Sequence, residues 1–127
     1  MTISSSGVPE PPRAGMFSNA RVRGDHFWIS GMHAAGPDGV VGGDDAHLQA
    51  REVFRRVTEL VRACGGTNRD VMLLRVYLSD MADKGEVGRA RAEFFTDPMP
   101  CSTLIGVAEL VHPGLRVEVE AEGIIER

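Results

Sequence analysis

The stretch that decides the fold lies near the end of the chain and reads Pro100-Cys-Ser-Thr-Leu-Ile-Gly-Val-Ala-Glu-Leu-Val-His-Pro-Gly-Leu-Arg-Val-Glu-Val-Glu-Ala-Glu-Gly-Ile-Ile125. A turn at residues 112–114 separates two extended runs. Side chains on a strand alternate between the two faces of a sheet, so the second run predicts one apolar and one acidic face. The apolar set is Val117, Val119, Ala121 and Gly123, and the acidic set is Glu118, Glu120 and Glu122. Neighbouring carboxylates repel each other, so the acidic face is either half solvated or lines a site or subunit contact.

Composition narrows the class of protein. The 127 residues match the size of one globular domain, and the net charge of −4 argues against a nucleic-acid-binding surface. No run of 18 apolar residues exists, which predicts no membrane span. The first residues lack the pattern of a signal peptide, and the two cysteines lack CxxC spacing, so we expect free thiols in the cytoplasm. The four histidines show no metal-ligand spacing, so no metal site is predicted.

The first half of the chain predicts an arm, two strands and a long helix. Residues 1–14 are rich in Ser, Pro and Gly and are expected to form a flexible arm, which leaves residues 15–127 as a single domain. Short strands are predicted over 20–24 and 26–30, with a turn between them. Apolar residues at three- and four-residue steps predict a helix over 45–64, with an acidic cap before it and Gly65-Gly66 after it.

The second half completes an α+β fold. Residues 70–79 predict a central strand because both of its faces are largely apolar, and residues 83–95 predict a second helix. The predicted order is β-β-α-β-α-β-β, a mixed sheet with two helices on one face. The other face would carry Trp28, Leu73 and Tyr77, and an apolar sheet face left open usually meets another subunit.

Several short pieces, in this order and with these gaps, resemble the RidA family, also called the YjgF family, over residues 15–125. They are Gly15–Ala20, Ile29-Ser30-Gly31, Gly65-Gly66, Val76–Met81, Phe94-Phe95, Ser102–Ala108 and Val117–Ala121. The resemblance implies a chorismate-mutase-like fold and a homotrimer with three clefts between subunits. It also implies hydrolysis of reactive enamines and imines to keto acids and ammonia, without a cofactor.

The resemblance assigns roles to individual residues and also shows a departure. Glu118 matches the carboxylate that handles the attacking water, and Ser30-Gly31 keeps the turn whose backbone amide holds the substrate. Ser102, however, stands where the family has the arginine that pairs with the substrate carboxylate. Phe17 stands at a tyrosine position and Gly88 near an asparagine position. The candidates to take over the role of this family arginine, which is to pair with the substrate carboxylate, are Arg13, Arg21, Arg23 and Arg116.

Three functions stay open at this point. The first is a divergent enamine or imine deaminase, in which Cys101, Ser102 or Thr103 contacts a small-molecule substrate and Phe17 and Trp28 form apolar walls. The second is a non-hydrolytic small-molecule-binding or regulatory trimer. The third is a pathway-dedicated tautomerase, dehydratase or cyclase with Glu118 as base.

Some of these residues also have a purely structural explanation. Phe17 and Trp28 are also explained by core packing, and the Ser102 hydroxyl by a backbone hydrogen bond. A nucleophilic Cys101 would need a base, for which His33 is the one candidate. Ribonuclease activity is disfavoured because the net charge of the chain is negative.

Overall fold

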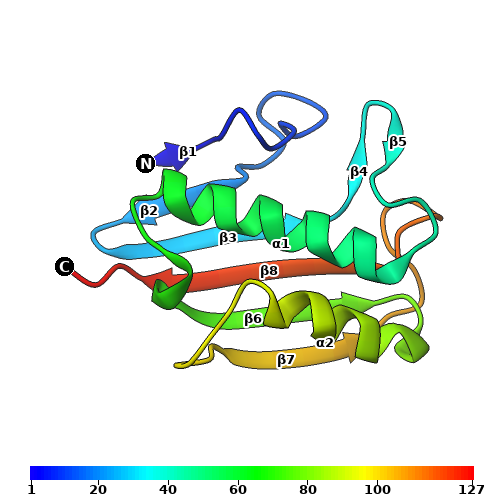
Figure 1. The fold of residues 1–127 in the computed structure, drawn as a ribbon. Coiled ribbons are helices and arrows are strands. Elements are labelled where there is room, and N and C mark those ends of the chain that lie inside the picture. The colour runs from blue at the N-terminus through cyan, green and yellow to red at the C-terminus, as the bar shows by residue number, and fades with distance from the viewer.

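The computed structural model describes all 127 residues and contains a six-stranded mixed sheet with two helices on one face (Figure 1). In spatial order the strands are β1 (Thr2–Ile3), β2 (Ala20–Arg23), β3 (His26–Met32), β8 (Val117–Ile124), β6 (Val71–Leu78) and β7 (Cys101–Gly106). Only β6 and β7 run parallel, and every other pair is antiparallel. A separate hairpin, β4 (Ala35–Gly36) and β5 (Gly39–Val40), forms around a turn at residues 37–38. The predicted fold class and order of the main elements are confirmed, with β1 and the hairpin added.

Both helices cover the same face, α1 over β3 and β8 and α2 over β6 and β7 (Figure 1). α1 (Ala46–Ala63) begins where the Asp45 side chain accepts a 3.0 Å hydrogen bond from the Leu48 amide, which is an N-cap contact. The predicted start of the second helix at residue 83 was one residue early, and its predicted end at 95 was three late. A 3₁₀ turn at Met81–Asp83 comes first, and α2 spans Lys84–Ala92. The chain then bends and places Phe95 in the core. No helix has the length and apolarity needed to cross a membrane.

The core lies between the helices and the covered face of the sheet. The apolar set of β8 is buried as its alternation predicts, and it packs against the fully buried α1 residues Val53, Phe54, Val57, Leu60 and Val61. Cys64 is buried here as well, and this burial raises the pKa of its thiol, as expected for an unreactive core cysteine. Two polar side chains of α1, Gln49 and Arg56, are also buried.

The first 14 residues lie along the domain. Thr2 and Ile3 pair with β2, Val8 is buried against the core, and the Asn19 side-chain amide donates a 2.9 Å hydrogen bond to the Pro9 carbonyl. These contacts make residues 8–12 part of a wall around the candidate site described below. The division into a flexible arm and a domain stays a prediction.

Candidate functional site

The site begins at an irregularity in β3. Ile29 pairs with Ala121 and Met32 with Val119, so Ser30 and Gly31 together stand opposite Glu120. This is a β-bulge, in which one extra residue bends the strand and re-aims neighbouring side chains. The Ser30 hydroxyl donates a 2.5 Å hydrogen bond to the Ser18 carbonyl, which ties the bulge to the preceding segment. The bulge therefore turns the backbone of Gly31 toward the acidic side of β8.

Glu118 fills the space that Gly31 leaves open. A side chain at position 31 would overlap the Glu118 carboxylate, since even the carboxyl carbon lies 2.9 Å from the point where a Cβ would stand. Both residues line a cavity of about 550 Å³, the Glu118 pocket, together with Phe17, Ser30, His33, Arg56, His112 and residues 8–12. A cavity of this size accommodates a small metabolite. Four of the predicted site residues, Phe17, Ser30, Gly31 and Glu118, thus meet in one place.

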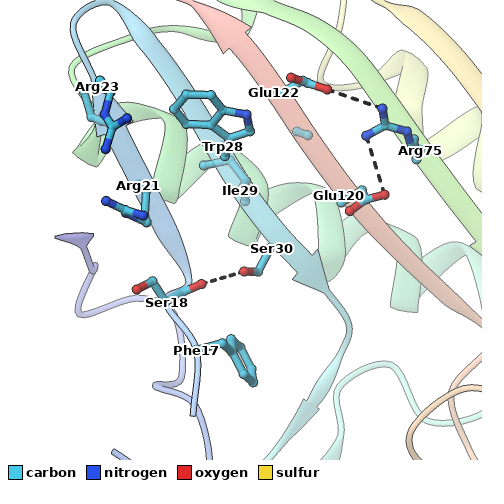
Figure 2. Close-up of a pocket in the computed structure, with 12 residues that line it drawn as sticks. Phe17, Ser18, Arg21, Arg23, Trp28, Ile29, Ser30, Arg75, Glu120 and Glu122 are labelled. Atoms are coloured by element: carbon cyan, nitrogen blue, oxygen red, sulfur yellow. Dashed lines mark hydrogen bonds and ion pairs between the residues drawn. The ribbon is translucent and has the colours of Figure 1, made fainter. Parts of the chain in front are cut away.

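The three glutamates of β8 are not equivalent. Glu120 accepts a 2.5 Å hydrogen bond from the Tyr77 hydroxyl, and Glu122 lies 3.4 Å from Arg75 and 3.3 Å from His26. Arg75 lies between the two carboxylates, as Figure 2 shows, and its distance to Glu120 is 3.7 Å. Glu118 has no hydrogen-bond or ion-pair partner. Burial, and secondarily the charge of Glu120, raise the pKa of the Glu118 carboxyl above its ordinary value. Glu118 is therefore the carboxylate that is free to accept a proton.

Two histidines and a buried arginine complete the walls of the Glu118 pocket. Arg56 donates to the carbonyls of His33 and Ala35 at 2.6 and 2.8 Å and pairs with Glu52 at 2.7 Å, so it holds the chain just after the bulge. The His33 Nδ1 accepts a hydrogen bond from the Ala35 amide, and its ring meets His112 edge-on with centroids 5.7 Å apart. Burial, together with Arg56 and His112, lowers the pKa of His33. The lowered pKa favours the neutral ring, and because Nδ1 accepts a hydrogen bond, the neutral ring carries its hydrogen on Nε2.

A second hollow of about 520 Å³, the sheet pocket, lies on the face of the sheet that the helices leave open (Figure 2). Arg21 and Arg23 of β2 line it together with Trp28, whose ring stacks on His26 with centroids 4.0 Å apart. Phe17 and Ser30 line both hollows. Trp28 is 42% exposed on this face, and Leu73 and Tyr77 are half-buried, so the predicted apolar side chains lie here among charged ones.

The remaining predicted residues lie on β7, at the far edge of the sheet. Gly31 and Thr103 lie in the same row across the sheet, since Glu120 and Arg75 are the paired residues between them. Three strand spacings, or about 14 Å, separate the two. Cys101 and Thr103 point to the open face, whereas Ser102 points to the helix side, where the Arg91 guanidinium donates to its hydroxyl at 3.3 Å. Within one chain these residues do not join Glu118. Cys101 is exposed and lies apart from His33, so the proposed nucleophile–base pair does not form within the chain.

Sequence reasoning missed two features of the Glu118 pocket and one arginine beside the edge strand β7. Arg56 and the His33–His112 pair were not assigned to a pocket, because Arg56 binds carbonyls 21 and 23 positions away and the two histidines are 79 positions apart. Arg91 was absent from the arginines considered as anchors, although its position three residues after Gly88 on a helix was a usable signal. Arg116, which was considered, already forms ion pairs with Asp44 at 2.8 Å and with Asp83 at 3.0 Å.

Comparison with known proteins identifies the family. The family model described as Endoribonuclease L-PSP matches residues 8–125. The chain belongs to this family. A relative named 2-iminobutanoate/2-iminopropanoate deaminase, from Dermatophagoides farinae, is 29% identical over 127 residues, which cover 98% of this chain and 95% of the relative.

Solved structures of the family have the same fold. RidA from an Antarctic Psychrobacter species superposes with a TM-score of 0.88 at 27% identity, covering 98% of this chain and 99% of that one. A Pseudomonas aeruginosa protein of unknown function superposes with a TM-score of 0.86 at 35% identity, covering 99% and 92%. The predicted membership of the RidA family is confirmed. No three His, Cys, Asp or Glu side chains of this RidA-family chain converge where they could share a metal ion.

Proposed function

We propose that this RidA-family protein hydrolyses a small imine or enamine to a carbonyl compound and ammonia in the Glu118 pocket. The observation that carries the proposal is the Glu118 carboxylate, which lacks a partner, is half buried, has a raised pKa and lies against Gly31. A general base acts best when its pKa approaches the working pH. The relative named as an iminobutanoate and iminopropanoate deaminase supports the same reaction class.

The proposed reaction needs no group beyond water and the protein. Glu118 accepts a proton from water as the water oxygen bonds to the imine carbon, and the C=N electron pair moves to nitrogen, which takes up a proton. The resulting carbinolamine collapses when its hydroxyl proton passes, by way of Glu118, to the amino nitrogen as the C–N bond breaks, which releases ammonia and leaves a C=O group. The neutral His33, through its Nε2 hydrogen, and the Gly31 amide are the donors proposed to hold the substrate. An enamine enters the same route after a proton is added at carbon.

The active form is proposed to be a homotrimer with its sites between subunits. Cys101, Ser102 and Thr103 lie on an edge strand whose six residues are exposed or half exposed, and edge strands of this kind are usually covered. The uncovered sheet face with Trp28 supports a subunit contact as well. Light scattering is expected to give three times the chain mass, and a monomer would contradict the proposal. The two free cysteines are consistent with a reducing compartment such as the cytoplasm.

The test is a deaminase assay in which an amino-acid oxidase generates a panel of imino acids and semicarbazide traps the imine that survives. Wild type is expected to reduce the trapped product, and Glu118→Gln to lose about 100-fold or more of this activity. Glu122→Gln is the matched control, because Glu122 lies on the same strand face but is already paired with Arg75 and His26. Wild type that is inert on the whole panel, or equal losses in both variants, would overturn the proposal.

A further inference from the structure

Arg91 on α2 is a cation that has no carboxylate partner. The two glutamates of its own helix and helix end are occupied, because Glu86 pairs with Arg89 at 2.6 Å and Glu93 pairs with His47 at 3.0 Å and with Arg51 at 3.2 Å. The one hydrogen bond that the Arg91 side chain makes goes to the Ser102 hydroxyl, at 3.3 Å. A guanidinium held only by a neutral hydroxyl keeps most of its donors available for an anion.

The place of Arg91 in the fold leaves room for that anion. Its Nη2 lies 3.8 Å from the point where a side chain of Gly88 would begin, so the guanidinium lies over a position without a side chain. The neighbouring strand β7 pairs with β6 on one side only, and Ser102 is exposed. Arg91 therefore stands at an open edge of the molecule, fixed in place by α2 and by β7.

The Glu118 pocket lacks the cation that a carboxylate-bearing substrate would need. Its one arginine, Arg56, is buried and already bound to Glu52 and two backbone carbonyls. A substrate carboxylate placed beside the Glu118 carboxylate would be repelled unless a second positive charge came near. Glu118 points to the open face of the sheet, whereas Arg91 and Ser102 lie on the helix side of β7. One chain cannot bring both to one small molecule, because the sheet separates them.

We propose that Arg91 binds the carboxylate of a 2-imino acid substrate whose imine carbon lies beside Glu118 of a neighbouring copy of the chain. This inference rests on the proposed function for the reaction, and what it adds is the residue that selects a substrate with a carboxylate. Ser102 positions the guanidinium, and the absent Gly88 side chain leaves the approach open. Arg91 is then a specificity-determining residue, and a neutral imine has no need of it.

The first experiment measures binding and turnover separately. Binding of 2-oxobutanoate, the carbonyl counterpart of a 2-imino acid, is followed by NMR titration, and turnover is compared between 2-imino acids and a neutral cyclic imine. Arg91→Ala is expected to weaken 2-oxobutanoate binding and kcat/KM for 2-imino acids by about 10- to 100-fold, the usual contribution of a charge-assisted contact. Turnover of the neutral imine is expected to stay unchanged. Arg89→Ala is the matched control on the same helix, since Arg89 is exposed and paired with Glu86.

The outcomes separate this inference from the proposed function. Active wild type with Arg91→Ala equal to Arg89→Ala would overturn the role of Arg91 and leave the deaminase intact. Wild type that is inert on imines but still binds 2-oxobutanoate through Arg91 would overturn the proposed deaminase activity. It would support Arg91 as the residue that binds the carboxylate. Wild type that does not bind 2-oxobutanoate, or an Arg91→Ala variant that falls apart into monomers in light scattering, would overturn the anchor. In the last case the partner of Arg91 is a subunit and not a substrate.

A mixing experiment tests whether the two residues come from different copies. Glu118→Gln and Arg91→Ala chains are co-expressed in equal amounts, each being defective alone. If a trimer site takes Glu118 from one copy and Arg91 from the next, each mixed trimer regains one intact site, or about one quarter of all sites after random assembly. If both residues belonged to one site of the same chain, every site would keep a defect and no activity toward 2-imino acids would return.

Discussion

The two faces of the central strand β8 have opposite chemistry although their residues alternate along one stretch of chain. The covered face carries Val117, Val119 and Ala121 in a dry core against α1, and the open face carries Glu118, Glu120 and Glu122. On the covered face every position is specified by packing. On the open face two glutamates are paired and one is left free. The difference shows that one strand supplies both a packed core face and an unpaired carboxylate, with the sheet itself separating the two.

Two glycines allow this comparison to be tested at the level of single atoms. Gly123 and Gly31 each occupy a position where an added Cβ would overlap a neighbour, but the neighbours differ in kind. At Gly123 the neighbours are the Asp70 backbone carbonyl and the Phe27 ring in the core, and at Gly31 the neighbour is the Glu118 carboxylate. Backbone atoms and buried rings cannot move aside cheaply, whereas the end of a flexible side chain can.

The largest effect is expected for Gly123→Ala. The added methyl group would force β8 away from the segment that precedes β6, and we expect a loss of about 3 kcal/mol or more in the free energy of unfolding. Chemical denaturation measures this change. Gly85→Ala, at a helical position with open space around the added Cβ, is the control and is expected to be neutral or slightly stabilising. A Gly123→Ala variant as stable as wild type would show that the covered face is not closely packed.

Gly31→Ala is expected to have a smaller effect on stability and a large effect on activity. Rotation of the Glu118 side chain relieves the overlap, so we expect less than about 1.5 kcal/mol of destabilisation. The same rotation moves the base, so deaminase activity is expected to fall about 100-fold. Denaturation and the imine assay on one sample give both values. A stable, fully active Gly31→Ala variant would contradict the assignment of Glu118 as the base in this position.

The smallest effect is a pH-dependent stabilisation by Glu118→Gln. Burial and the neighbouring Glu120 raise the pKa of Glu118 in the folded state, so the folded protein holds this proton more tightly than the unfolded chain does. Wild type is therefore expected to lose stability, relative to Glu118→Gln, as the pH rises from the ordinary glutamate value of about 4.3 through the raised value. The variant is expected to be slightly more stable at pH 7, and the difference is expected to vanish near pH 3.

Thermal unfolding of both proteins from pH 3 to pH 8 measures the difference. Glu122→Gln is the control, because this carboxylate is paired with Arg75 and gains nothing from neutralisation. A constant difference between wild type and Glu118→Gln at all pH values would mean that the charge of Glu118 is not the cause. A higher stability of wild type at pH 7 would contradict the raised pKa.

Much of the fold was predictable because it depends on local periodicity. The alternation along residues 117–124 and the apolar stripe of α1 correctly predicted which side chains are buried, and Asp45 was correctly predicted as part of the helix start. The second helix was less accurate at its ends because a 3₁₀ turn precedes it and the chain bends after it. Pairing partners were accessible only through the resemblance to the RidA family.

The sequence by itself determined the elements, their order and the presence of a row of glutamates, since these follow from steps of two and of three to four residues. Only the tertiary structure decided which glutamate is free. The bulge at Ser30–Gly31 brings β3 against Glu118. On β6, Tyr77 donates a hydrogen bond to Glu120 and Arg75 forms an ion pair with Glu122. It also placed Arg91 beside Ser102. Such contacts join residues far apart in the chain, and alternation specifies which face a side chain occupies but not what it meets there.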